Sequence, residues 1–129
     1  DTDLARWVYL DIGKFSGLAE TIDEAIRYRI ETEADDRPLP GTGTGIGTGS
    51  GTGSGTGNGT GSGAAARGPC ILAGPSCDSA DVLYERRPVA LPLSLRAGDR
   101  VWIHAAGAYT SSYASVGFNG FPPLDTVVI

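Results

Sequence analysis

Residues 70–85 read CILAGPSCDSADVLYE, and this stretch decides the fold class. Two short apolar runs, residues 70–73 and 82–85, lie on either side of a turn indicated by Gly74 and Pro75. Short apolar runs bounded by turn formers are typical of β-strands. The pattern recurs at residues 101–105 and 126–129. We therefore predict a mainly β fold, an antiparallel Greek-key sandwich or barrel with one or two short helices, and not a βαβ sheet.

The flanking sequence fits the same plan. Residues 7–12 form an apolar and aromatic run closed by Gly13, which predicts a mostly buried strand. Apolar residues then recur near helical spacing between residues 18 and 28, which predicts a short amphipathic helix or a turn of helix. Pro88 and Pro92 indicate turns, and residues 93–100 are typical of a turn that leads into the strand at 101–105. Residues 108–115 are ambiguous between a helical turn and a loop.

A low-complexity stretch divides the chain into three segments. From residue 41 to residue 63 every odd position is glycine, and such a sequence cannot bury apolar area or hold a fixed backbone. We interpret residues 41–63 as a flexible Gly/Thr/Ser tether, because a GxGxxG phosphate loop needs a strand before it and a helix after it. Residues 1–40 would be the first part of one β domain, and residues 64–129 the remainder with the chemical motifs.

Composition narrows the classes of function. The 10 Lys and Arg residues against 15 Asp and Glu residues leave a net charge of −5, without a basic cluster larger than Arg86 and Arg87. Nucleic acid is therefore not an expected partner. The first residues lack the features of a signal peptide and no apolar stretch is long enough to span a bilayer, so we expect no membrane partner and a cytoplasmic location. Cys70 and Cys77 do not have the spacing of a zinc site or a disulfide framework.

Two loops offer side chains for chemistry. The Gly74 and Pro75 turn would present Cys77 and Asp78 at a strand end, where a thiol can donate a proton or attack and a carboxylate can hold a cation. A free cysteine is, however, usually an inert core residue, and Asp78 or its neighbour could cap a short helix. Residues 107–113 offer hydroxyl and N–H groups suited to phosphate, although most Ser-rich loops bind nothing.

Three motifs in order carry a family resemblance: GPSCDSADVL at 74–83, GDRVWIHAAGAYTSSYAS at 98–115 and GFNGFPP at 117–123. They resemble the carboxy-terminal β domain of the pyridoxal-phosphate-dependent ornithine and lysine decarboxylases, which belong to the alanine racemase-like barrel group. The opening WVYLDIGKFSGLAETIDEAIRYRI, at 7–30, is similar to the passage from the barrel into this domain. The matching regions cover nearly everything outside the tether.

The resemblance implies roles for individual residues. It implies an α/β barrel domain that binds pyridoxal 5'-phosphate, and a homodimer whose active sites form between subunits. Cys77 would reprotonate the substrate α-carbon after carbon dioxide leaves, and Asp78 would bind the distal ammonium of a diamine amino acid. Tyr109 would contact the cofactor near its phosphate, and Phe118 would lie at the subunit junction close to the site. A second acidic group is expected near the first strand, where the register leaves Asp11 and Ile12 open.

Two polar residues do not match the family's motifs. Lys14 is the chain's only lysine and does not match the lysine that binds the cofactor, and His104 does not match the histidine that stacks on it. We interpret both as structural, so the chain should be inactive without the barrel. The resemblance favours a decarboxylase of ornithine or lysine, giving putrescine or cadaverine for polyamine biosynthesis. The alternatives are a noncatalytic regulatory or interaction module, a fragment of a diaminopimelate decarboxylase, and a β domain without a ligand.

Overall fold

The computed structural model describes residues 5–40 and 65–129. The predicted tether at residues 41–63 lies outside these residues, and so do the boundaries that it sets between the three predicted segments. Within the described ranges the fold is mainly β, as the sequence predicts, and the helical elements are two short 3-10 segments. In chain order the elements are β1 (Arg6–Tyr9), η2 (Ala19–Glu24), β2 (Ile30–Thr32), β3 (Arg67–Ala73), β4 (Val82–Leu83), β5 (Val89–Pro92), β6 (Val101–Ile103) and η3 (Phe118–Gly120).

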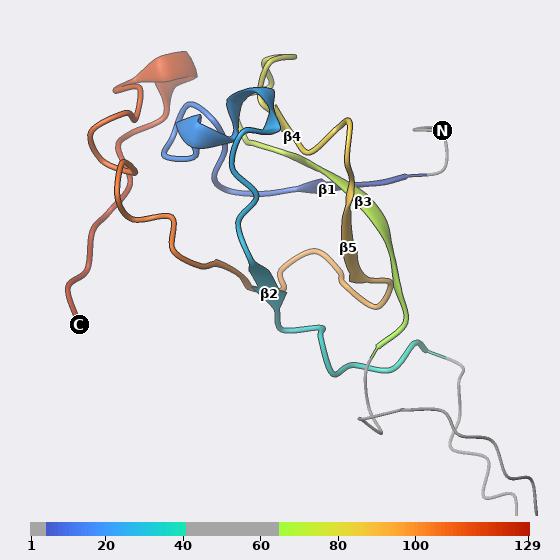
Figure 1. The fold of residues 1–129 in the computed structure, drawn as a ribbon. Coiled ribbons are helices and arrows are strands. Elements are labelled where there is room, and N and C mark those ends of the chain that lie inside the picture. The colour runs from blue at the N-terminus through green and yellow to red at the C-terminus, as the bar shows by residue number, and fades with distance from the viewer. Residues whose placement is uncertain (1–4, 41–64) are drawn as a thin grey trace, which may run out of the picture.

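Strand β3 is the centre of the larger sheet (Figure 1). Strand β1 pairs with one edge of β3, with Trp7 opposite Ile71, and β4 and β5 pair with the other edge. The last four residues of β3 are buried, which explains why they form a continuous apolar run. The β1–β3 pair is parallel, whereas the other strand pairs of the described residues are antiparallel, so one parallel pair stands within the predicted mainly antiparallel fold. Apolar patterning indicates which residues are buried but carries no information on strand direction.

A second, two-stranded sheet packs against the core. Strands β2 and β6 are antiparallel, with Ile30 opposite Ile103, and both of these side chains contact the buried cluster. Strands β2 and β5 were missed by the sequence analysis: β2 is only three residues long, and Pro88 and Pro92 indicated turns where β5 runs along a sheet edge. The buried hydrophobic cluster comprises Leu10, Leu18, Ala34, Cys70, Leu72, Leu83, Tyr84, Leu91 and Leu95.

Between residues 18 and 28, where a short amphipathic helix or a turn of helix was predicted, the structure has only the turn. Only the 3-10 segment η2 forms, and it is interrupted at Ile22 and Asp23, where the backbone is not helical. The reason is tertiary: the buried Tyr84 hydroxyl donates a hydrogen bond to the Ile26 carbonyl at 3.1 Å and accepts one from the Tyr28 amide at 3.0 Å. The core therefore uses backbone groups that a helix would have paired internally.

An ion pair joins the two parts of the domain that flank the tether. The Arg37 guanidinium donates to both carboxylate oxygens of Asp99, at 2.6 and 2.9 Å, and the Ser94 hydroxyl donates to the Arg37 carbonyl at 2.8 Å. Hydrogen bonds from Arg37 and from the Arg96 amide lower the pKa of Asp99 to about 2. Asp99 belongs to the turn predicted at residues 93–100, which is confirmed.

The end of the chain departs from the prediction. Residues 126–129 form no strand, and Val127 and Val128 are 80% and 91% exposed. Residues 108–115, left open between a helical turn and a loop, form a series of turns. In Figure 1 the red carboxy-terminal segment lies beside the blue segment that follows β1. Across the described ranges, no helix is both long and apolar enough to cross a membrane.

Candidate active site

The loop at residues 74–81 leaves the carboxyl end of β3 and carries Cys77 at its exposed tip. Its backbone has φ of +61° at Cys77, in the left-handed region. For a residue with a Cβ this conformation costs on the order of 1–2 kcal/mol. The Cys77 sulfur lies 3.7 Å from the Pro75 carbonyl oxygen. The alternative of an inert core cysteine therefore does not describe Cys77, since its thiol is accessible.

Asp78 follows on the same exposed turn. One carboxylate oxygen accepts a hydrogen bond from the Ala80 amide at 2.8 Å, and the Asp78 carbonyl accepts one from the Asp81 amide at 2.9 Å. The first bond is local, but it closes a turn and does not cap a helix, since no helix directly follows Asp78 in the described chain. A carboxylate that accepts one amide bond has further lone pairs, so Asp78 remains able to bind a cation.

A hollow of about 330 Å³ lies beside the two residues. Cys77 and Asp78 line it together with Trp7 and Tyr9, two exposed aromatic side chains of β1. The parallel β1–β3 pairing brings them there, because alternate residues of a strand share one face. The hollow thus combines a thiol, a carboxylate and aromatic surface, which suits a ligand with an amine and an aliphatic chain.

Phe118 lies close to the same loop. Its ring stacks on Phe15, with the ring centroids 4.1 Å apart and the planes at 17°. The neighbouring Asn119 side chain donates a hydrogen bond of 2.7 Å to the Ser76 carbonyl, one residue before Cys77. The GFNGFPP motif and the GPSCD motif are therefore in direct contact, although about 40 residues separate them in the chain.

Tyr109 does not line the hollow beside Cys77 and Asp78. Its ring is 45% exposed and stacks on Tyr113, with centroids 4.9 Å apart and planes at 10°. Its main chain belongs to a turn in which the Tyr113 amide donates to the Tyr109 carbonyl at 3.0 Å. Of the four site residues expected from the sequence, three come together around the loop at 74–81, and Tyr109 is not brought to them.

The comparisons identify the family. Residues 1–107 match the family model described as pyridoxal-dependent decarboxylase, C-terminal sheet domain. The chain belongs to this family. The match includes Cys77 and Asp78, whereas Tyr109 and Phe118 follow its last residue.

Relatives of this decarboxylase sheet domain are named as decarboxylases of ornithine or of lysine and ornithine. The chain is 46% identical to an ornithine decarboxylase of Schizosaccharomyces pombe over 52 residues, which are 40% of this chain and 11% of that protein. It is 43% identical to a lysine/ornithine decarboxylase of Selenomonas ruminantium over 60 residues, 46% of this chain and 14% of that protein. The chain thus spans a small part of these relatives.

Solved structures agree with this assignment. A crystal structure of SrLDC in complex with PLP and cadaverine is similar at a TM-score of 0.61 and 27% identity, over 95% of this chain and 23% of that one. A second structure, lysine decarboxylase from Selenomonas ruminantium, gives a TM-score of 0.60 at the same identity and coverage.

Lys14, His104 and Cys70 are not part of the hollow beside Cys77. The Lys14 amide donates to the Asp81 carboxylate at 2.8 Å, and the His104 Nε2 lies 3.0 Å from a Glu31 carboxylate oxygen. Cys70 is fully buried in β3, and burial raises the pKa of its thiol, which disfavours the reactive thiolate. Only one of the two cysteines is therefore suited to chemistry.

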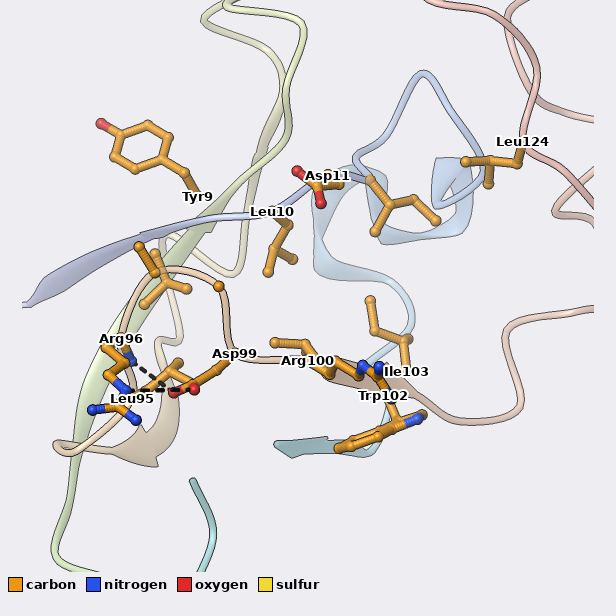
Figure 2. A pocket seen from close by; sticks show the side chains of 15 residues that line it. Tyr9, Leu10, Asp11, Leu95, Arg96, Asp99, Arg100, Trp102, Ile103 and Leu124 are labelled. Carbon is orange, nitrogen blue, oxygen red and sulfur yellow. Dashed lines mark hydrogen bonds and ion pairs between the residues drawn. The ribbon is translucent and has the colours of Figure 1, made fainter. Parts of the chain in front are cut away.

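A larger hollow of about 670 Å³ lies between β1 and residues 95–103 (Figure 2). In Figure 2 Leu10 and Tyr9 point to opposite sides of β1, as successive strand residues do. Asp11 and Ile12 both line this hollow; Asp11 is exposed, whereas Ile12 is half-buried and also packs against the core. Of the two positions that the sequence left open, Asp11 is the one with a carboxylate, and it does not line the hollow beside Cys77.

The sequence analysis missed several residues at the site. Trp7 and Tyr9 were interpreted as part of a mostly buried strand, which is wrong, since both are exposed and β1 lies at the edge of the sheet. Asp81 and Asn119 were part of matching motifs without an assigned role, yet both hydrogen-bond to Ser76. No local signal distinguished them, since Asn119 bonds to a turn distant in the chain and Asp81 also accepts the amide of the distant Lys14.

Proposed function

We propose that this chain is the carboxy-terminal part of a pyridoxal-phosphate-dependent decarboxylase that converts ornithine or lysine into putrescine or cadaverine. The observation that carries the proposal is the exposed thiol of Cys77, held in a left-handed backbone beside the Asp78 carboxylate. Backbone strain of this kind concentrates at active sites. The names of the relatives supply the two substrates.

Two side chains would act on the substrate. The Cys77 thiol would give its proton to the α-carbon after carbon dioxide has left, as a general acid. The Asp78 carboxylate would accept hydrogen bonds from the distal ammonium, a charge-assisted contact that disfavours neutral side chains. Asp11 lines the second hollow and is a candidate for another carboxylate that serves the distal amine.

The residues present fit one edge of a cofactor site. Tyr109 presents an exposed phenol, and the exposed Ser111 and Ser112 follow it in the same turn, so hydroxyl donors suited to a phosphate are available. When bound, pyridoxal phosphate supplies the electron sink for decarboxylation. The lysine that would bind it must come from elsewhere, because Lys14 is the chain's only lysine and its segment is held against Asp81.

Tyr109 does not line the hollow that Cys77 and Asp78 share, which supports a dimer with shared active sites. One domain would offer Tyr109 to the active site of its own barrel and Cys77 with Asp78 to the active site of the partner. The enzyme would then be a homodimer of barrel and sheet domains that acts in cytoplasmic polyamine biosynthesis. A noncatalytic module that docks on a decarboxylase subunit is the second candidate, favoured by the exposed hollows and by the absence of a matching cofactor lysine.

Reconstitution tests the proposal. The chain is mixed with a separately produced barrel domain of a lysine/ornithine decarboxylase, and putrescine and cadaverine are measured by chromatography. We expect activity that falls roughly 100-fold or more in Cys77→Ala, the usual loss for a positioned general acid. Cys70→Ala is the matched control, because it removes a buried thiol and should keep most of the activity of the mixture.

Further outcomes separate the candidates. Asp78→Asn should raise KM for the diamine amino acid more than it lowers kcat, because the distal ammonium loses its charged partner. Tight binding to the barrel domain without amine production would favour the noncatalytic module. Activity on diaminopimelate instead of ornithine and lysine would favour a fragment of a diaminopimelate decarboxylase, one of the alternatives considered from the sequence.

A further inference from the structure

A buried carboxylate lies beneath the Cys77 loop. Asp81 is only 2% exposed. Its Oδ1 accepts a hydrogen bond from the Lys14 amide at 2.8 Å, and its Oδ2 accepts bonds from the Ser76 hydroxyl at 2.6 Å and the Ser76 amide at 3.2 Å. Because a buried carboxylate is stable only when donors satisfy it, these three bonds fix Ser76 relative to the end of β1.

Two glycines close around the same carboxylate. A Cβ placed on Gly13 would lie 2.1 Å from Asp81 Oδ1, and a Cβ placed on Gly74 would lie 2.2 Å from Oδ2. The Gly74 amide also donates to the Asp81 carbonyl at 2.8 Å. The turns that follow the two parallel strands can thus approach Asp81 only because neither glycine has a side chain.

The residues on both sides of Cys77 are held in place. Ser76 is fixed by Asp81 from below, and its carbonyl accepts the 2.7 Å hydrogen bond from the Asn119 side chain. Asp78 is fixed through its carbonyl, which accepts the Asp81 amide. A non-glycine residue stays in the left-handed region only when its surroundings impose that conformation. Cys77 sits between two such anchored neighbours.

We propose that Asp81 and Asn119 are positioning residues that, through Ser76, hold Cys77 in its left-handed conformation and thereby aim its thiol. The catalytic consequence rests on the proposed function, whereas the conformational part concerns this chain alone. Neither residue need touch the substrate. Asn119 also links this role to the GFNGFPP motif, whose contact with the loop is the Asn119–Ser76 hydrogen bond.

A double-mutant cycle on the full chain tests the conformational part. Glycine tolerates a positive φ, so Cys77→Gly should raise the folding equilibrium constant about tenfold relative to Cys77→Ala. When Asn119→Ala or Ser76→Ala is also present, the loop can relax. The ratio of the folding equilibrium constants of Cys77→Gly and Cys77→Ala should then shrink to about twofold or less. Urea denaturation followed by tryptophan fluorescence measures each constant. Ser76→Ala and Asn119→Ala leave the Asp81 backbone bonds in place and are milder than a change at Asp81.

Two controls separate positioning from a general loss of stability. Ser94→Ala removes a buried hydroxyl hydrogen bond elsewhere, and it should lower stability without changing the gain from Cys77→Gly. Ala105 also has a positive φ, of 58°, so Ala105→Gly should gain stability regardless of Asn119→Ala. A gain from Cys77→Gly that is the same with and without Asn119 and Ser76 would overturn the proposal.

The catalytic part uses the reconstituted mixture. Asn119→Ala should lower kcat about tenfold with less than a twofold change in KM, because a misaimed thiol affects proton delivery and not ammonium binding. Equal losses in Asn119→Ala and Ser94→Ala would contradict positioning. If Cys77→Ala itself left activity unchanged, the proposed function would fail, while the double-mutant cycle would still decide whether Asp81 and Asn119 hold the loop.

Discussion

Replacing Gly74 with alanine should destabilise the domain, because it disturbs the loop that carries Cys77. The new Cβ would lie 2.2 Å from Asp81 Oδ2 and 2.4 Å from its Cγ, more than 1 Å inside a normal contact. Asp81 is 2% exposed and its carboxylate accepts hydrogen bonds from Lys14 and Ser76, so it can move only by breaking them. Relief requires either a backbone shift or the loss of its hydrogen bonds to Ser76.

The expected cost follows from these two terms. Overpacking a closely packed site costs roughly 1–3 kcal/mol. Loss of a hydrogen bond to a charged group adds about 1.5–3 kcal/mol. A total of about 3 kcal/mol, near the lower end of the two ranges added together, is a large part of the roughly 5–15 kcal/mol that stabilises a typical domain. At about 4–8 °C per kcal/mol for a domain of this size, the Tm of Gly74→Ala should fall by roughly 12–24 °C.

Thermal unfolding followed by circular dichroism measures this shift, with Gly107→Ala as the matched control. A Cβ on Gly107 would meet nothing within 4 Å, and its backbone does not require a positive φ. That change should be neutral or stabilise the domain by roughly 0.4–1 kcal/mol, because it restricts the unfolded chain. A Tm for Gly74→Ala within about 3 °C of the Gly107→Ala value would refute the close packing around Asp81.

Three further changes test other parts of the fold. The pKa of Asp99 is lowered from 3.8 to about 2, so its contribution to stability is complete above about pH 4 and is lost as the pH falls to 2. In urea titrations Asp99→Asn should therefore be less stable than the unchanged chain at pH 6, and it should lose less stability than that chain between pH 4 and pH 2. Tyr84→Phe should destabilise the domain by roughly 1–3 kcal/mol in urea denaturation, because two buried backbone groups lose their partner, whereas Tyr9→Phe, at an exposed site, should change stability by less than about 0.5 kcal/mol. Removing residues 126–129 should change the Tm by no more than about 3 °C, since these residues are exposed and form no strand; a larger fall would show that they pack on the domain.

The sequence allowed the site to be located better than it allowed the sheet to be assembled. Gly74 and Pro75 after a buried run indicate a turn, so an exposed loop carrying Cys77 and Asp78 could be predicted from local chemistry. Sheet direction could not, because parallel and antiparallel partners present the same apolar pattern. The short strand β2 and the proline-flanked strand β5 were missed for a related reason, since both exist only through pairing with strands distant in the chain.

The helical segment predicted near residues 18–28 is only a 3-10 turn, and the strand predicted at 126–129 does not form. The first has helical spacing, but Tyr84 hydrogen-bonds to its backbone and η2 stops early. The second has strong β propensity, but in the described ranges no strand pairs with it. Local propensity is a weak preference that a few tertiary hydrogen bonds outweigh.

By itself, the sequence determined that this is a mainly β domain with a turn that exposes Cys77 and Asp78, because turn formers and apolar runs act over a few neighbouring residues. Tertiary structure alone decided that β1 lies parallel to β3, that Trp7 and Tyr9 face the thiol, and that Asp81 and Asn119 meet at Ser76. These contacts join residues up to about 70 positions apart, and only packing in three dimensions selects such partners.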